Sequence, residues 1–143
     1  MITCALVLLW LAVVFPIQAR ECMPAMKEGW VRLPPAAMPM MAGFGRITNP
    51  CAMPVVIVSA SSPAFGDVSL HETRNIDGVN RMRELQELRV APDGSATLKP
   101  GGMHLMLMQP RAPLKEGSKV VVKFTLQDGR EMLAELVVRK PLP

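Results

Sequence analysis

The chain has no tyrosine, aromatic residues make up only 4% of it, and it contains only two histidines. With few rings for base stacking, no dense run of lysine or arginine and a net charge of only +4, the sequence argues against nucleic-acid binding. It contains no HExxH motif and no phosphate-binding glycine loop, and we find no Ser-His-Asp set to nominate. We therefore expect a protein that is not an enzyme.

A hydrophobic run long enough to span a membrane is also missing. The apolar stretch 5–15 near the N-terminus is too short for a comfortable span. It ends in Pro16, and Ile17-Gln18-Ala19 then fits a small-residue cleavage site. We expect residues 1–19 to be an export signal peptide that is cleaved after Ala19, and residues 20–143 to form one domain without stable membrane insertion. An uncleaved anchor is the alternative.

The cysteines have no CxxC spacing, which makes redox catalysis a poor interpretation. Signal cleavage would remove Cys4 and leave Cys22 and Cys51 in an oxidising compartment. Two cysteines there most simply form one disulfide. Two thiolate metal ligands are the alternative. Lipid attachment at Cys22 is disfavoured because the charged Glu21 precedes it.

Half of the residues are hydrophobic and a fifth are charged, as in a globular protein. Turn signals recur about every 8–12 residues, which is typical of a single antiparallel β-sandwich or barrel. Asp77-Gly78 and Asp128-Gly129 each predict a hairpin turn. The segment 81–90 also has helix-forming residues, but its alternation and its place after a turn favour a strand. We expect strands in the segments 29–33, 42–48, 54–62, 67–75, 81–90, 103–108, 119–126 and 130–139.

Methionine is abundant, with 12 residues, and it gathers in the sequence PGGMHLMLMQP at 100–110. On a strand, alternate side chains share a face. His104, Met106 and Met108 therefore share one face, and we assign Leu105 and Leu107 to the core.

The second histidine, His71, points away from the apolar face of its own predicted strand. Met82 lies across the predicted turn at Asp77-Gly78, so hairpin pairing could bring the two close. Thioether sulfur is soft and imidazole is borderline, and together they suit Cu(I), and sometimes Cu(II), rather than Mg²⁺ or Ca²⁺. The alternative without a metal is that the methionines pack in the core and the histidines are ordinary polar surface residues.

The full spacing, His71-x10-Met82-x21-His104-x-Met106, resembles the signature of the periplasmic copper chaperone family called PCuAC. Three flanking segments also resemble that family, and the likeness covers roughly residues 28–138: WVR at 30–32, FGRITN at 44–49 and PGGMHLML at 100–107.

The resemblance implies an all-β fold, a single cupredoxin-like Greek-key sandwich with its core at about 28–138 and a loose C-terminal tail. It implies a periplasmic copper chaperone that binds Cu(I) in preference to Cu(II) at an exposed site of His71, Met82, His104 and Met106. Independently of the resemblance, we expect the protein to be a monomer. Copper would pass to the CuA centre of cytochrome c oxidase subunit II, alongside Sco-type chaperones.

Other methionines are candidates for additional contacts near this site: Met103, Met108, Met40 and Met41. Met38 belongs to the same MPMM segment as the last two, and for this segment adaptable apolar packing is the alternative. Two other functions remain open. A blue-copper electron-transfer protein would need a cysteine thiolate beside its histidines. A metal-free exported β-sandwich would bind a partner and retain no copper.

Overall fold

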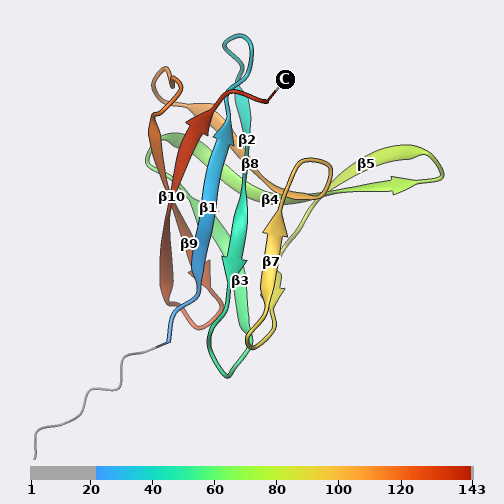
Figure 1. Cartoon of the computed structure of the whole chain (residues 1–143), viewed down its shortest axis with the longest axis vertical. Helices are drawn as coiled ribbons and strands as arrows, with labels where there is room; N and C mark the ends of the chain where they lie inside the picture. Colours follow the sequence, from blue (N-terminus) through green and yellow to red (C-terminus); the bar gives the residue numbers. More distant parts are fainter. Residues whose placement is uncertain (1–21, 143) are drawn as a thin grey trace, which may run out of the picture.

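The computed structural model describes residues 22–142, and within this range the chain forms strands and no helix (Figure 1). The predicted signal peptide lies outside the described residues, and none of the described residues forms a helix that could cross a membrane. The ten strands are β1 Ala25–Arg32, β2 Met40–Thr48, β3 Val55–Ser61, β4 Phe65–Ile76, β5 Val79–Glu84, β6 Leu88–Val90, β7 Ser95–Leu98, β8 Met103–Pro110, β9 Lys119–Leu126 and β10 Glu131–Arg139.

The strands wrap around one core, in the order β5-β4-β8-β2-β1-β10-β9-β3-β6. A pairing between Ala60 of β3 and Val68 of β4 closes the wrapped sheet between the strands that lie next to its two ends, and β7 pairs with β2. The prediction of an all-β sandwich is confirmed. One pairing differs from the antiparallel expectation, because β1 runs parallel to β10 from Trp30 to Arg32.

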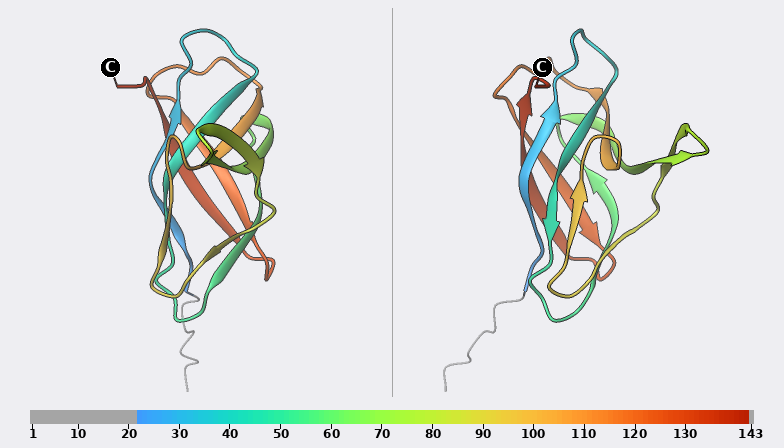
Figure 2. Two further views of the ribbon diagram at one scale, coloured as in Figure 1. Left: turned by 90° about the vertical axis from the view of Figure 1, so that its right-hand side faces the viewer. Right: turned by 45° about the vertical axis from the view of Figure 1, so that its right-hand side comes forward.

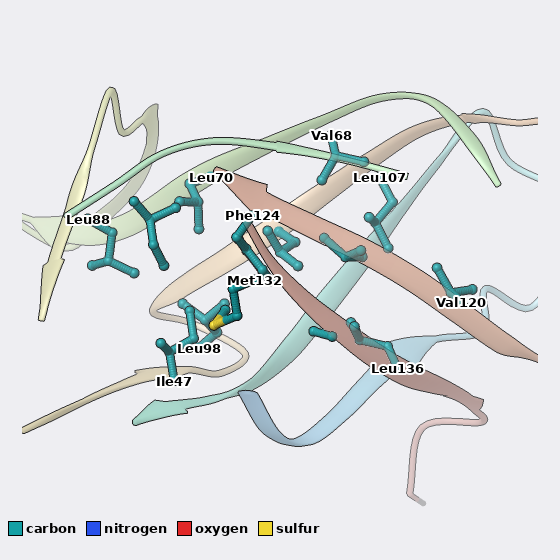
Figure 3. Packing of buried hydrophobic residues seen from close by; sticks show 14 of the residues in the cluster. Ile47, Val68, Leu70, Leu88, Leu98, Leu107, Val120, Phe124, Met132 and Leu136 are labelled. Atoms are coloured by element: carbon teal, nitrogen blue, oxygen red, sulfur yellow. The ribbon is translucent and has the colours of Figure 1, made fainter. Parts of the chain in front are cut away.

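The core consists of alternate side chains that point inward from both sides of the sandwich (Figure 3). In β9 and β10 every second residue is buried, as the period of two in the sequence predicts. Phe124 and Leu136 are fully buried there, and Leu105 and Leu107 are fully buried on β8. The assignment of these two leucines to the core is therefore confirmed, and β8 has an inner and an outer face.

The β4–β5 hairpin projects from the body of the sandwich (Figures 1 and 2). It turns at Asp77-Gly78, where both residues have positive φ angles of 52° and 81°. Gly78 adopts this left-handed backbone without strain because it has no Cβ. All six residues of β5 are exposed. The predicted hairpin is present, but its outer strand has no hydrophobic face that packs on the core.

The prediction of one strand over 81–90 is wrong. β5 ends at Glu84, and the separate strand β6 pairs with β3. The amide of Leu85 still bonds to the carbonyl of Leu70 on β4, at 2.8 Å, before the chain departs. Leu88 and Val90 are buried in the core. The projecting hairpin offers no such burial, so the chain leaves it to place these two residues under β3.

The N-terminal end of the described chain is tied to the loop after β2. A disulfide joins Cys22 to Cys51, with the Cα atoms 5.6 Å apart. The buried Asn49 holds the same loop, because its side-chain oxygen accepts a hydrogen bond from the Cys51 amide and its Nδ2 donates to the carbonyl of Val90. This end of the sandwich is therefore fastened by both covalent and polar contacts.

Candidate metal centre

Three adjacent strands, β5, β4 and β8, place the two histidines and Met82 together. His71 of β4 is directly opposite His104 of β8, and Met82 of β5 is opposite Thr73 of β4. Directly opposed residues project from the same side of a sheet, so these side chains share one face. The centroids of the two imidazole rings are 6.0 Å apart, and the ring planes differ by 23°.

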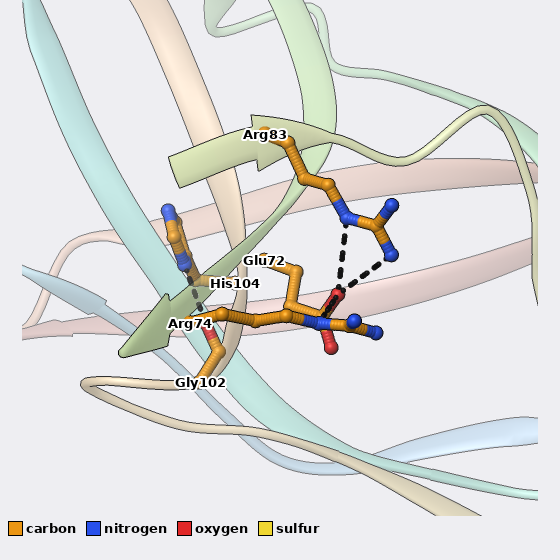
Figure 4. A network of polar contacts seen from close by, with 5 residues as sticks. All are labelled: Glu72, Arg74, Arg83, Gly102 and His104. Atoms are coloured by element: carbon orange, nitrogen blue, oxygen red, sulfur yellow. Dashed lines mark hydrogen bonds and ion pairs between the residues drawn. The ribbon is translucent and has the colours of Figure 1, made fainter. Parts of the chain in front are cut away.

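The ring of His104 lies between the Gly102 carbonyl and the sulfur of Met82. Its Nδ1 lies 2.9 Å from the carbonyl oxygen of Gly102 (Figure 4). A carbonyl oxygen only accepts hydrogen bonds, so Nδ1 carries the proton, and Nε2 of the neutral ring is left with a lone pair. This Nε2 lies 3.3 Å from the sulfur of Met82, which has no proton either. With the ring neutral, neither atom can donate a hydrogen bond to the other, whereas both can donate electrons to a cation placed between them.

His71 contributes a buried nitrogen without a hydrogen bond. Its Nε2 lies 2.9 Å from the hydroxyl of Ser69, while its Nδ1 is buried and has no partner among the described residues. Burial lowers the pKa of His71, and His104 lowers it further, whereas the carboxylates of Glu84 and Asp67 raise it. The lowered pKa favours the neutral imidazole, which is the form that ligates a metal.

Met106 is the next residue along the same face of β8. It lies opposite Ser69 on β4 and Ala42 on β2. The structure thus brings His71, His104 and Met82 into direct proximity and places Met106 one strand step away from His104, about 6.5–7 Å along the strand.

The expectation of an exposed site is correct for only part of it. Met82 is 55% exposed, but His104 is only 7% exposed and Met106 only 9%. These two residues are covered because β8 lies inside the sheet, between β4 and β2, whereas Met82 sits on the projecting hairpin. The site therefore has a buried side on β8 and an accessible side on β5.

The carboxylate next to His71 in sequence is not part of the site. Glu72 is opposite Met103 and Arg83 and so points to the other face of the hairpin. One of its oxygens lies 2.9 Å from Arg74 and 3.2 Å from Arg83 (Figure 4). The hydrogen bond from Arg74, together with that from Arg83, holds the pKa of Glu72 below its usual value. Glu72 therefore links the two strands of the hairpin.

The four additional methionines divide between the two faces. Met41 is buried in the core and Met103 packs against it, so both lie on the inner face, away from the histidines. Met108 lies on the outer face with Met106, and Met40 of β2 is directly opposite Met108. In residues 22–142 no group of three or more His, Cys, Asp or Glu side chains is placed to hold a metal ion.

Sequence reasoning missed two contacts that orient the histidines. Ser69 binds His71, and the Gly102 carbonyl binds His104. A signal for the first was present, because a polar residue two positions before a histidine shares its face on a strand. A backbone carbonyl leaves no such signal.

The comparisons with known proteins cover most of the chain. The model of the family described as "Putative lipoprotein LpqE-like" matches residues 25–138. The chain is 37% identical over 103 residues to "Putative lipoprotein Lxx21020" of Leifsonia xyli subsp. xyli, which covers 71% of this chain and 61% of that protein. It is 27% identical over 88 residues to "Uncharacterized protein RP573" of Rickettsia prowazekii, and the match covers 61% of this chain and 49% of that protein. The chain thus spans about half to three fifths of these relatives.

Solved structures share the fold. The solution structure of Cu(I)-bound DR1885 from Deinococcus radiodurans has a TM-score of 0.66 at 26% identity, covering 86% of this chain and 83% of that one. The apo PCuAC domain from PmoF1 has a TM-score of 0.66 at 18% identity, covering 81% and 92%. The sandwich described above is therefore the fold of PCuAC domains.

Proposed function

This chain belongs to the LpqE-like family, and we propose that it is a copper chaperone which carries Cu(I) rather than an enzyme. The observation that carries the proposal is the position of Nε2 of His104, which lies 3.3 Å from the sulfur of Met82 while Nδ1 of the same ring is bonded to the Gly102 carbonyl. The Nδ1 of His71, which is buried and has no hydrogen-bond partner within residues 22–142, adds a third donor. Met106 supplies the fourth from the same face. Two thioethers and two imidazoles form a soft donor set, which favours Cu(I) over Cu(II).

Transfer would proceed by ligand exchange from the accessible side of the site. Met82 sits on a strand that is exposed along its whole length, so it can leave the copper while the three other ligands remain in place. An acceptor that offers thiolates, which bind Cu(I) more strongly than thioethers, would then approach from this side. We propose the periplasm as the location, and the CuA centre of cytochrome c oxidase subunit II, with Sco-type chaperones, as the destination.

The blue-copper alternative lacks its thiolate. Cys22 and Cys51 are joined in a disulfide, and they are the two cysteines among the described residues. A blue-copper site requires a free cysteine sulfur beside its histidines. The structure therefore supports the histidine and methionine site over an electron-transfer centre.

The test is a competition for Cu(I) against a coloured Cu(I) chelator. The unaltered protein should retain one equivalent, and a His71→Ala/Met106→Ala double variant should retain none while its circular dichroism remains that of a folded β-sandwich. Met53→Ala is the matched control, because Met53 is 72% exposed in the loop between β2 and β3. Equal copper retention by the double variant and the control would overturn the proposal, and no retention by the unaltered protein would favour the metal-free alternative.

A further inference from the structure

The outer face of β8 continues past the candidate metal centre into a second group of donors. Met108 follows Met106 on this face, and the strand register places Met40 of β2 on one side of it and Asp67 of β4 on the other. This group, Met40, Met108 and Asp67, is called here the outer row. Met40 is 38% exposed and Met108 is half-buried, so both residues are partly accessible from the surface.

The register brings the two sulfurs within reach of one ion. The Cβ atoms of directly opposed residues on neighbouring antiparallel strands are about 4.5–5.5 Å apart. Rotation about the Cα–Cβ and Cβ–Cγ bonds of each methionine moves its sulfur, so the two sulfurs can converge without movement of the backbone. Both residues lie on the face opposite the core, so neither is needed to fill it.

The chemistry of the outer row selects a soft cation of low charge. Thioethers carry no charge and prefer Cu(I) among biological metals. Asp67 is exposed and forms no ion pair among the described residues, so its negative charge is available to attract a cation. The row has no imidazole, and its ligands are more exposed than His104 or Met106. It should therefore bind more weakly than the site of the histidines.

We propose that Met40 and Met108, with Asp67 beside them, form a second and weaker site for a soft monovalent cation. Met106 separates this site from the histidines, at about 6.5–7 Å along the strand from Met108. An ion held by the outer row is one strand step from the sulfur of Met106. The site extends the proposed copper transport by providing a point of entry or exit, but its occupancy does not require the first site.

Silver(I) is the probe, because it resembles Cu(I) in its preference for sulfur and is stable in air. The protein is labelled with ¹³C at its methionine methyl groups, and the signals of Met40 and Met108 are identified from Met40→Leu and Met108→Leu variants. We expect Met82 and Met106 to shift during the first equivalent of silver and Met40 and Met108 to shift during the second. Calorimetry should show the loss of the second equivalent in Met40→Leu/Met108→Leu, with the first retained.

Two controls separate the possible outcomes. In His71→Ala/Met106→Ala, the signals of Met40 and Met108 should still respond to silver; this result would support the outer row even if the first site proved wrong. The methyl signal of the exposed Met53 should stay unchanged. The proposal is overturned if the methyl signals of Met40 and Met108 have not shifted after two equivalents of silver have been added. It is also overturned if the Met53 signal shifts in parallel with them, which would indicate unspecific binding to exposed thioethers.

Discussion

The molecule contains two hairpins closed by the same Asp-Gly pair, and they differ in what their strands bury. In the β9–β10 hairpin, which turns at Asp128-Gly129, every second residue is buried in the core. In the β4–β5 hairpin, which turns at Asp77-Gly78, β5 has no buried residue at all. The same pair of residue types therefore lies in the turn of an integral part of the sandwich in one case and of a projecting arm in the other.

The difference separates stability from the proposed function. Burial of apolar side chains is the main source of folding free energy, and the β9–β10 hairpin contributes heavily to it. The β4–β5 hairpin contributes Met82, a ligand that must be able to release copper. A strand held by hydrogen bonds to one neighbour can open locally without unfolding the domain. Four measurements can test this separation.

The largest contrast should appear in stability. Phe124→Ala removes a fully buried ring on β9, and we expect a loss of about 3–5 kcal/mol in the free energy of unfolding. Ile76→Ala, at the exposed tip of the β4–β5 hairpin, should change it by no more than about 0.5 kcal/mol. Urea unfolding of both variants provides the measurement, with Phe124→Leu as a milder replacement if the alanine variant does not fold. Similar losses in the two hairpins would refute the contrast.

The disulfide should matter for stability and not for copper. Cys22 and Cys51 are 29 positions apart, and opening a loop of this length should lower the free energy of unfolding by about 3.6 kcal/mol on the chain-entropy model. The Cys22→Ser/Cys51→Ser variant tests this by urea unfolding without leaving an unpaired thiol. Its affinity for Cu(I), measured against the same chelator, should equal that of the unaltered protein. A weakened affinity would show that this end of the sandwich takes part in metal binding.

Copper should stabilise the projecting hairpin. At a free Cu(I) concentration of about 100 times Kd, bound metal adds about 2.7 kcal/mol to any opening that releases it. If Met82 is a ligand, hydrogen exchange of the β5 amides that pair with β4 should slow by up to about a hundredfold. The His71→Ala/Met106→Ala variant should show no such change. Unaltered β5 exchange in the copper-loaded protein would exclude Met82 from the ligand set.

The smallest effect should be a pH dependence of the free energy of unfolding, caused by His71 at the base of the β4–β5 hairpin. Burial keeps the pKa of His71 below its ordinary value of 6.5, against the opposing effect of Glu84 and Asp67, and His104 lowers it further. The folded protein therefore binds fewer protons at His71 than the unfolded chain does. The contribution of His71 to the free energy of unfolding is therefore fully present well above pH 6.5. It is lost as the pH falls through 6.5 toward the pKa that His71 has in the folded protein.

Urea midpoints of the copper-free protein at pH 7.5, 6.5 and 5.5 would measure this loss. His71→Gln removes the titrating group, so we expect a smaller decrease in the midpoint between about pH 7.5 and 5.5 for this variant. An equal decrease in the variant would assign the pH dependence to other groups.

Much of this architecture could be predicted from local pattern. The alternation in β9 and β10, the Asp-Gly turns and the inward assignment of Leu105 and Leu107 all depend on the period of two along a strand. The inner position of Met103 follows from the same parity, because it lies two residues before Leu105. The face of Met41 could not be derived in this way, because it depends on where β2 begins and which strand it pairs with.

Residue spacing alone determined which side chains share a face within each strand, and it placed His104 with Met106 and Met82 across a turn from His71. Only the tertiary structure decided how those faces meet. The register of β4 against β8 sets His71 opposite His104. The position of β8 inside the sheet buries His104 and Met106 while the projecting hairpin exposes Met82. The reason is physical: side-chain alternation is a local property of the backbone, whereas strand order and burial depend on contacts between residues far apart in the chain.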